Sequence, residues 1–268
     1  MEASGTYYFA LASYLFRNNI QVCVENPLVI KRYSQTMLYR AKTDKKDSII
    51  IAEYGMKYDL KLWKLESENN IKLRQLYTRL ELVIKQIHQN RHQLEAFIIS
   101  GCLDRFLEKE LKKDISHLEK SKLKLEQQML LLSKEEYGNT LDHLQSIPGV
   151  GPKTSMMMAL ITDNFKKFDN YKQLIAYIGF SPRVYQSGTS VRGKGHICKM
   201  GKSQLRKLLY LCSWTAKKYN KSCREMYTRL KACGKPERVI KIAIANKLIK
   251  QIFAIGKSNQ IYKENTCF

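Results

Sequence analysis

Apolar residues recur at alternating steps of three and four over a long central part of the sequence. Such a and d positions with charged flanks are typical of coiled coils, and the break at Ser100-Gly101 separates two series. The spacing predicts an antiparallel hairpin of two long helices, a spacer or a dimerisation arm. The apolar positions are Leu73, Leu76, Leu80, Val83, Ile87, Leu94 and Phe97, then Leu107, Leu111, Ile115, Leu118, Leu125, Met129 and Leu132.

Positive charge is concentrated in the last third of the chain. The 268 residues contain 47 Lys and Arg against 24 Asp and Glu, a formal charge of +23. Residues 181–268 carry +17 of this, and the first 180 residues carry +6. Such a density repels itself unless a polyanion lies nearby, so we expect a nucleic acid as partner, bound with a steep salt dependence. An anionic membrane surface is the alternative that charge alone leaves open.

The composition excludes several other classes of protein. Apolar residues make up 44% of the chain and charged residues 26%, as in folded proteins with real cores. No run approaches the roughly 18 apolar residues of a membrane span, and no basic-then-apolar leader opens the sequence. Seven cysteines without any C-x-x-C pair argue against a disulfide framework or a zinc site, so we expect a reducing bacterial cytoplasm.

The first 60 residues have the element order of an α/β domain. Helical spacing over residues 7–18 precedes a strand-like run at residues 20–24, and Thr43 would cap a following helix. Because one five-residue strand cannot form a sheet, this part reads as an incomplete domain.

Three carboxylates in this part, Glu2, Asp44 and Asp47, are the candidate metal ligands and candidate catalytic residues. Asp44 and Asp47 are three residues apart on one helical face, so both can point at one Mg²⁺ site. Two-metal phosphoryl transfer needs three or four carboxylates, because both ions must be held and neutralised. The structural alternative is that the helix dipole favours acidic residues in a first turn.

The segment Ile147-Pro148-Gly149-Val150-Gly151, followed by a Met-rich apolar helix, matches the turn of a helix-hairpin-helix element. Its glycines let the backbone approach a phosphate, the N–H groups of the next helix face it, and Lys153 adds a charge. Such an element binds the nucleic-acid backbone and reads no sequence. A glycine-rich helix connection without a ligand is the alternative.

Ser187 lies between Arg183 and Arg192 in a glycine-rich basic stretch, residues 181–202. A serine that attacks a phosphodiester needs the anion neutralised and oriented, which arginine forks do. His196 has no evident carboxylate to orient it, so a hydrolase triad is not indicated. The alternative is an ordinary turn serine before glycine.

Two further helices are expected after this stretch, over residues 203–219 and 237–253, the second of them buried. The candidate nucleic-acid contacts come from the glycine-rich turn, the basic stretch and the first of these helices. They are Gly149, Gly151, Lys153, Arg183, Arg192, Lys194, Lys199, Lys202 and Arg206.

Taken together, these motifs resemble the insertion-sequence-110 type of transposase, the relatives of the Piv DNA invertase, over nearly the whole chain. The resemblance rests on residues 144–152, Phe165-Lys166-Lys167-Phe168, residues 176–183, Gln186-Ser187-Gly188, Lys199-Met200-Gly201, Leu205-Arg206, residues 244–248, residues 1–5 and residues 41–48.

The resemblance implies a fold, a chemistry and partners. The fold would be α/β plus α: a partial RuvC-like (RNase H fold) domain at 1–62, a coiled-coil hairpin at 63–135 and a mainly helical transposase domain at 136–268. Glu2, Asp44 and Asp47 would be the second, third and fourth members of a D-E-D-D tetrad that binds Mg²⁺. Ser187 would form a covalent phosphoserine link with DNA. A structured guide RNA would choose the sites, and the coiled coil would assemble a homo-oligomer, a dimer or a tetramer.

The sequence departs from this family at its start. The first aspartate of the tetrad belongs on a strand upstream of the glutamate motif, which here begins at residue 2. We therefore expect a chain that lacks this strand and aspartate, through truncation, decay or a misplaced start. Two other functions stay open: a nucleic-acid-binding remnant without strand transfer, and a RuvC-like nuclease with a helix-hairpin-helix module.

Overall fold

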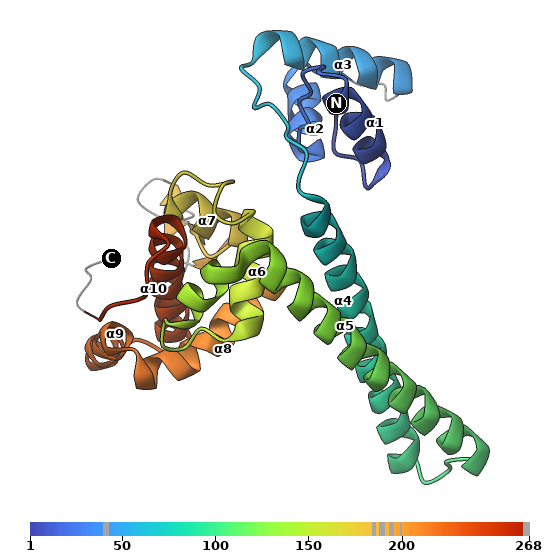
Figure 1. Ribbon diagram of the computed structural model, residues 1–268, viewed down its shortest axis with the longest axis vertical. Helices are drawn as coiled ribbons and strands as arrows, with labels where there is room; N and C mark the ends of the chain where they lie inside the picture. Colours follow the sequence, from blue (N-terminus) through green and yellow to red (C-terminus); the bar gives the residue numbers. More distant parts are fainter. Residues whose placement is uncertain (40–42, 184–185, 188–190, 193–195, 199, 265–268) are drawn as a thin grey trace. The chain divides into compact units, whose positions relative to one another are not determined.

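The computed structural model describes residues 1–39, 43–183, 186–187, 191–192, 196–198 and 200–264, with the backbone alone at 186–187 and 191–192. The chain divides into two compact units, Met1–Ser67 and Glu68–Phe268, each described by itself. Both units are mainly helical (Figure 1). No helix in these ranges is both long enough and apolar enough to cross a membrane.

The described residues of the first unit form three helices and two isolated β-bridges. Residues 1–3 pair with the segment before the second helix through a parallel bridge between Glu2 and Glu25, and Cys23 forms an antiparallel bridge with Leu62. Within the strand-like run expected at 20–24, the bridge residue is Cys23, and Glu25 follows just after the run. A RuvC-like sheet stays a prediction. The helices are α1 (Tyr7–Arg17), α2 (Pro27–Thr36) and α3 (Asp44–Lys57).

The core of the first unit is small. Ile30 and Tyr33 of α2 pack with Ile50 of α3, and the Trp63 ring packs edge-on against Phe9 and Phe16 of α1. Because apolar burial is the main stabilising term, this unit has far less of it than the second.

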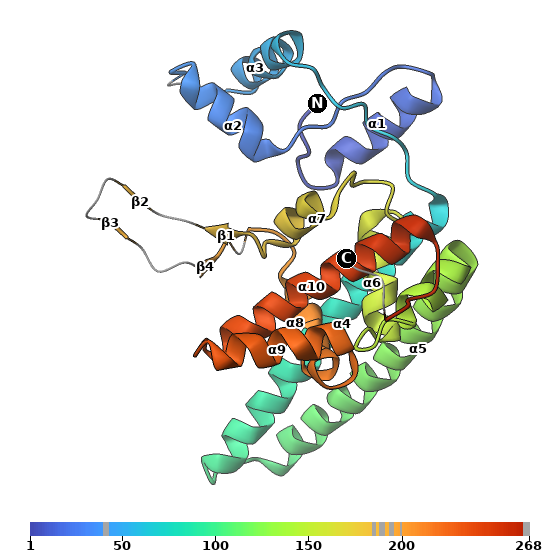
Figure 2. The ribbon, with the colours of Figure 1, turned by 90° about the vertical axis from the view of Figure 1, so that its left-hand side faces the viewer.

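Two long helices open the second unit, as the apolar spacing predicts. The helix α4 (Glu68–Ile99) and the helix α5 (Arg105–Gln145) run side by side in opposite directions, with the turn at Gly101 (Figures 1 and 2). Among the predicted apolar positions far from this turn, Leu73, Leu80 and Met129 are buried, whereas Leu107 near the turn is exposed. A coiled-coil supercoil stays a prediction.

The base of this hairpin is part of the main core. Leu73, Leu80 and Met129 belong to the same buried cluster as the C-terminal helices, so the hairpin and these helices form one unit. The helix α5 continues past the predicted seam and changes direction at Gly138, whose φ of 26° and ψ of −107° are not helical.

In the described residues, four helices complete the core around a central helix, α10 (Glu237–Ser258). Its buried positions, including Ile240, Lys241 and Ile249, cover more than half of its circumference, which confirms the buried last helix expected from the sequence. The helix expected at 203–219 is also confirmed, whereas the helix at Lys221–Ala232 was not predicted. The other helices are α6 (Pro152–Thr162), α7 (Tyr171–Ile178), α8 (Ser203–Tyr219) and α9 (Lys221–Ala232).

Two small antiparallel sheets lie between α7 and α8. The strand β1 (Pro182–Arg183) pairs with β4 (His196–Ile197), and β2 (Gln186–Ser187) pairs with β3 (Val191–Arg192). Because the β2–β3 pair lies between β1 and β4 in the sequence, the two sheets are an inner and an outer part of one β-hairpin. We name residues 182–197 the serine hairpin. In Figure 2, β2 and β3 lie farther from the helices than β1 and β4.

A cluster centred on one glutamate ties α8, α9 and α10 together. The Glu237 carboxylate lies 3.0 Å from Lys217 Nζ and 3.4 Å from Lys241 Nζ, and it accepts a hydrogen bond of 2.8 Å from the Tyr227 hydroxyl. The Lys241 ammonium is buried and sits 3.3 Å from the centroid of the Trp214 ring. These interactions, the hydrogen bond from Lys217 first, lower the pKa of Glu237 to about 2.

This pKa shift predicts that the interactions of Glu237 with α8 and α9 weaken in acid, so that the free energy of unfolding falls. The ordinary pKa of the Glu237 carboxyl is 4.5, and in the fold it is about 2. Its contribution to the free energy of unfolding is therefore complete above about pH 4.5 and is lost as the pH falls toward 2. We expect the urea midpoint of the intact chain to fall over this window, and to fall less steeply in Glu237→Gln.

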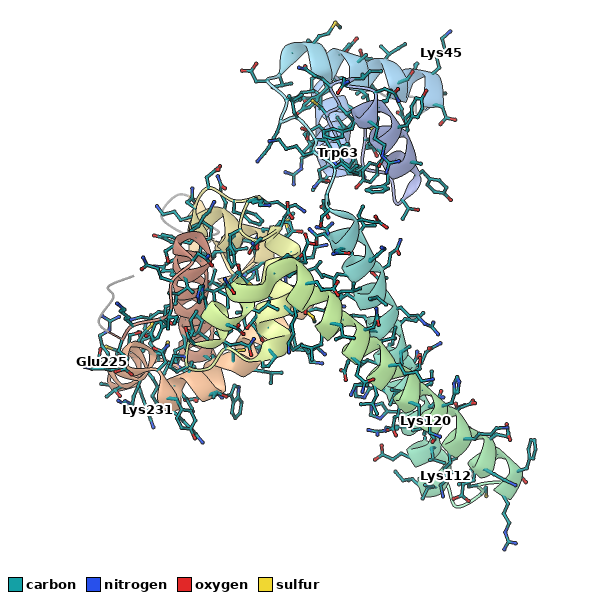
Figure 3. The ribbon with its side chains drawn as sticks, viewed as in Figure 1. Lys45, Trp63, Lys112, Lys120, Glu225 and Lys231 are labelled. Carbon is teal, nitrogen blue, oxygen red and sulfur yellow. The ribbon has the colours of Figure 1, made fainter. Side chains whose placement is uncertain are left out.

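The matched control is Glu225→Gln on α9, an exposed carboxylate that points away from the core (Figure 3). It should reproduce the pH profile of the unmodified chain. Equal pH slopes for Glu237→Gln and the unmodified chain would show that the Glu237 carboxylate does not couple the helices.

Candidate functional site

The two aspartates of the predicted metal site sit where the sequence puts them. Thr43 caps α3, its hydroxyl oxygen accepting from the Lys46 N–H at 3.3 Å, and Asp44 and Asp47 lie in the first turn. Asp44 is exposed and Asp47 is half-buried. Glu2, also half-buried, belongs to the paired segment at the chain start.

These carboxylates do not make a complete metal site. Across the described ranges of the chain, no three His, Cys, Asp or Glu side chains gather in a group that could hold a metal ion. The structure therefore does not bring Glu2 together with both aspartates. The three residues by themselves do not fit a two-metal centre, which needs three or four convergent carboxylates.

The glycine-rich turn of residues 146–151 joins α5 to α6. The Val150 N–H donates to the Ile147 carbonyl at 3.0 Å, and the N–H groups of Thr154 and Ser155 donate to the Gly151 carbonyl. Pro152 has no N–H and is the first helical residue, as helix starts allow. The turn thus presents the exposed Lys153 and the backbone of Gly151 at one helix N-terminus.

Gly149 is required because the turn touches α8. Its φ is +103°, and a Cβ there would lie 2.7 Å from the Ala216 Cβ and 2.9 Å from the Ala216 backbone. Gly151, two residues on, has open space at the Cβ position and a φ of −93°. A cavity of about 420 Å³ lies between the turn and α8, lined in part by Gly151, Lys153 and Leu211.

A network of hydrogen bonds centred on the buried Asn220 holds the turn of residues 146–151 against the core. The Asn220 amide nitrogen donates to Gln251 Oε1 at 3.0 Å and to the Pro148 carbonyl at 3.5 Å. The Asn220 side-chain oxygen caps α9, accepting from the Cys223 N–H at 3.2 Å. The backbone N–H of Tyr262 donates to the Ser146 hydroxyl at 2.9 Å. These bonds tie the turn to α9, α10 and the C-terminal segment, and no sequence motif signals them.

Ser187 lies in β2, opposite Val191 in the inner step of the serine hairpin. Arg192 pairs across the same ladder with Gln186, and Arg183 pairs with His196 in the outer step. The backbone therefore brings the segments of both arginines and of Ser187 into one narrow hairpin. The predicted contacts Lys194 and Lys199 lie outside the described residues, and Lys202 is exposed before α8.

The base of the hairpin is closed by two glycines. A Cβ at Gly179 would lie 2.4 Å from the Met200 carbonyl oxygen, and one at Gly201 would lie 2.1 Å from the Tyr177 carbonyl oxygen. Their φ values are +86° and +130°. The Cys198 N–H also donates to the Ser181 carbonyl at 2.8 Å. The two ends of the hairpin thus meet on the helical core.

Arg206 has a structural contact at this base. Its Nη1 donates to the Ile178 carbonyl at 2.7 Å, and the residue is half-buried. The sequence suggested only a nucleic-acid contact for Arg206, because its position in α8 says nothing about the carbonyl that it meets.

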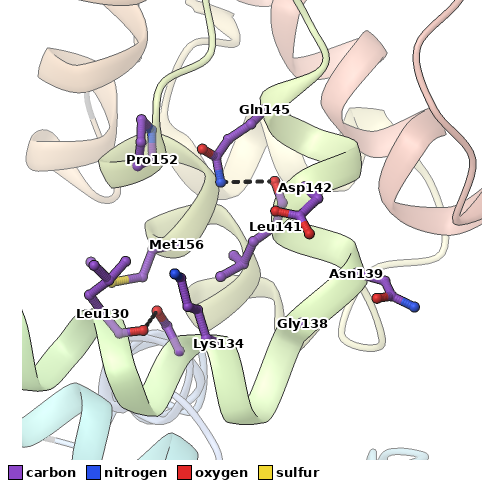
Figure 4. Close-up of a pocket in the computed structure, with 10 residues that line it drawn as sticks. Leu130, Lys134, Gly138, Asn139, Leu141, Asp142, Gln145, Pro152 and Met156 are labelled. Atoms are coloured by element: carbon purple, nitrogen blue, oxygen red, sulfur yellow. Dashed lines mark hydrogen bonds between the residues drawn. The ribbon is translucent and has the colours of Figure 1, made fainter.

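A separate cavity of about 550 Å³ opens at the Gly138 kink of α5 (Figure 4). Lys134 and Asp142 give its wall one cation and one acid. None of the residues predicted to form the site lines it. Its balanced charge makes it a poor match for a polyanion.

Comparison with known proteins identifies the chain. Residues 141–228 match the IS116/IS110/IS902 family of transposases, and residues 1–101 match the DEDD transposases of the IS110 type. The pilin gene-inverting protein of Moraxella bovis is 30% identical over 264 residues, which cover 97% of this chain and 80% of that protein. The chain belongs to the IS110 family of transposases.

Two other relatives agree with this. The pilin gene-inverting protein of Moraxella lacunata is 30% identical over the same shares of both chains. A 43.6 kDa protein of insertion element IS110 from Streptomyces coelicolor is 28% identical over 120 residues, 45% of this chain and 29% of that protein. Membership in the IS110 family supports DNA binding and a transposase or DNA-invertase activity, and the DEDD-type domain suggests use of a divalent metal.

The two turn glycines give a matched pair of variants. Gly149→Ala should lower the free energy of unfolding by roughly 2–4 kcal/mol, because its methyl group meets α8 and its φ is unfavourable. Gly151→Ala adds a methyl group in open space and should stay within about 0.5 kcal/mol of the unmodified chain. Urea denaturation of both variants tests this, and equal stabilities would mean that the turn does not touch Ala216.

Proposed function

We propose that this IS110-family chain exchanges DNA strands through a covalent bond between Ser187 and DNA. One observation carries the proposal: Ser187 belongs to a hairpin whose paired strands also contain Arg183 and Arg192. Two guanidinium groups near a phosphodiester would neutralise and orient it for attack.

The reaction needs no oxidant, reductant or energy source. The Ser187 hydroxyl loses its proton, its oxygen bonds to phosphorus, and one deoxyribose oxygen leaves and takes up a proton. One phosphodiester is broken and one phosphoserine ester is formed. A hydroxyl of a second DNA strand then attacks the ester, which joins the strands and restores the Ser187 hydroxyl.

The rest of the second unit would hold the DNA. The turn of residues 146–151 places the exposed Lys153 and the half-buried Gly151 at a helix N-terminus, which suits a phosphate without reading its base. Lys202 and Arg206 at the start of α8, with Lys194 and Lys199, would extend this basic surface. Such binding would keep the protein with the DNA of the bacterial nucleoid.

Mg²⁺ is the divalent ion that we propose, with Glu2, Asp44 and Asp47 as contributing carboxylates in a RuvC-like domain. The D-E-D-D resemblance and the shared first turn of α3 support this. No step of the exchange at Ser187 is assigned to the ion.

We further propose a structured guide RNA and a homo-oligomer. The +17 charge of residues 181–268 is large enough to serve two polyanions. Near the turn between α4 and α5, Ile98, Ile99 and Phe106 are exposed, and a second copy of the helical hairpin would cover such apolar surface.

One observation favours a second candidate, a nucleic-acid-binding protein without strand transfer. The described residues assemble no group of three metal ligands. Such a protein would bind DNA and RNA with a steep salt dependence and would form no covalent product with any divalent metal.

The test uses double-stranded DNA from the ends of the cognate insertion element, incubated with the full chain and Mg²⁺, then denatured. We expect a protein–DNA adduct that survives denaturation, and its complete loss in Ser187→Ala, because alanine has no hydroxyl to form the ester.

Ser181→Ala is the control, since it removes a hydroxyl just before the serine hairpin while its backbone carbonyl still accepts from Cys198. It should keep the adduct. An adduct that persists in Ser187→Ala would remove Ser187 from its role, and binding without any adduct in the unmodified chain would favour the second candidate.

A further inference from the structure

A basic cavity lies beside the base of the serine hairpin, outside the predicted turn. It measures about 530 Å³, within the range of sites that hold small ligands. Arg206 and Lys207 of α8 and Arg238 of α10 line it, and none of its lining residues is acidic. Two helices that are separate in sequence thus direct cations at one space.

Two of these cations are available for a ligand. Lys207 and Arg238 are exposed, and within the described part of the chain no acid pairs with either. The nearby acid, Glu237, is already occupied by Lys217 and Lys241. One guanidinium nitrogen of Arg206 donates a hydrogen bond to the Ile178 carbonyl, which fixes the guanidinium at the cavity edge.

The rest of the wall is apolar and aromatic. Phe180 is buried, and Ile197 and Tyr210 are half-buried. Flat rings and aliphatic groups offer a surface for a nucleobase, and base–aromatic stacking tolerates any base. The combination of cations and an aromatic wall suits a nucleotide, whose phosphate would contact Lys207 and Arg238 while its base stacks on the Tyr210 ring.

The cavity is within short reach of Ser187. Ile197 of its wall pairs with Pro182 at the start of the serine hairpin. Ser187 is seven positions after Phe180, so their Cα atoms are at most about 25 Å apart. At about 3.4 Å per nucleotide, a strand in the cavity lies within roughly seven nucleotides of Ser187.

We propose that this cavity binds one nucleotide of single-stranded DNA that flanks the phosphodiester attacked by Ser187. Lys207 and Arg238 hold its phosphate, and Tyr210 stacks on its base. This placement beside the reacting bond rests on the proposed strand exchange, whereas the cavity's affinity for single-stranded DNA does not.

The phosphate contacts are tested by the salt dependence of binding. The probe is oligo(dT) of about 20 nucleotides, longer than one binding site, bound to the full chain. Each lost phosphate contact lowers the salt slope of log K by about 0.7 for single strands. Lys207→Gln/Arg238→Gln should therefore lower the slope by about 1.4 and weaken binding roughly 25-fold at about 0.1 M salt.

The matched control removes two charges elsewhere in the same unit. Lys120 and Lys124 are exposed on the α5 arm, where Figure 3 labels Lys120. Lys120→Gln/Lys124→Gln has the same net charge as the cavity variant and should keep the slope of the unmodified chain. Equal slopes for all three proteins, or equal losses in both variants, would overturn the proposal.

The stacking contact has its own readout. A 2-aminopurine base in the oligo(dT) loses fluorescence when it stacks on a ring. We expect quenching on binding to the unmodified chain, and its loss in Tyr210→Leu with the salt slope retained. Quenching that persists in Tyr210→Leu would remove Tyr210 from the site.

Two further comparisons distinguish this proposal from RNA binding and from the proposed strand exchange. If Lys207→Gln/Arg238→Gln weakens binding of oligo(U) but not of oligo(dT), the DNA assignment is wrong. If the oligo(dT) results hold while the unmodified chain forms no adduct, the cavity's affinity stands and the proposed strand exchange fails. If the unmodified chain forms the adduct while the cavity variant binds oligo(dT) unchanged, the strand exchange stands and the cavity proposal fails.

Discussion

The contact between two backbone segments, at Gly179 and Gly201, fixes the base of the serine hairpin. Each glycine lies where a Cβ would be within 2.4 Å of a carbonyl oxygen of the other segment, and each has a positive φ. Together with the Arg206 bond to Ile178, this contact makes the serine hairpin leave and re-enter the core at one point. The basic cavity, whose wall includes Phe180 and Ile197, exists because the hairpin starts there.

The central helix α10 links the elements that would handle DNA. Its Gln251 bonds to Asn220, which holds the glycine-rich turn, and its Arg238 and Ile242 line the basic cavity. Its Glu237 fixes Lys217 of α8 and Tyr227 of α9. A shift of α10 would therefore move the turn, the cavity and the base of the hairpin together, although they are far apart in sequence.

Local patterns in the sequence predicted much of the helical structure. The three- and four-residue spacing predicted α4 and α5, and Thr43 predicted the start of α3. The helix α9 was missed although Cys223, Tyr227 and Leu230 face the core after the Asn220 cap. That spacing was a usable signal.

The site was less accessible to sequence reasoning, because it depends on contacts between distant residues. Spacing indicated that Asp44 and Asp47 share a face, but no spacing could relate Glu2 to them. The basic cavity joins Lys207 to Arg238 across α8 and α10, and the pairing of β2 with β3 joins Ser187 to Val191. Motifs identified the candidate residues and the family, whereas only the tertiary structure shows which of these residues lie close together.

The most direct test of the glycine contact is hydrogen exchange at the Cys198 amide, which donates to Ser181 at the base of the hairpin. Gly201→Ala would force a methyl group against the Tyr177 carbonyl oxygen, so the base should open. We predict that Cys198 loses its protection in this variant while the amides of α10 keep theirs. Unchanged protection at Cys198 would contradict the claim that the two glycines hold the base of the hairpin closed.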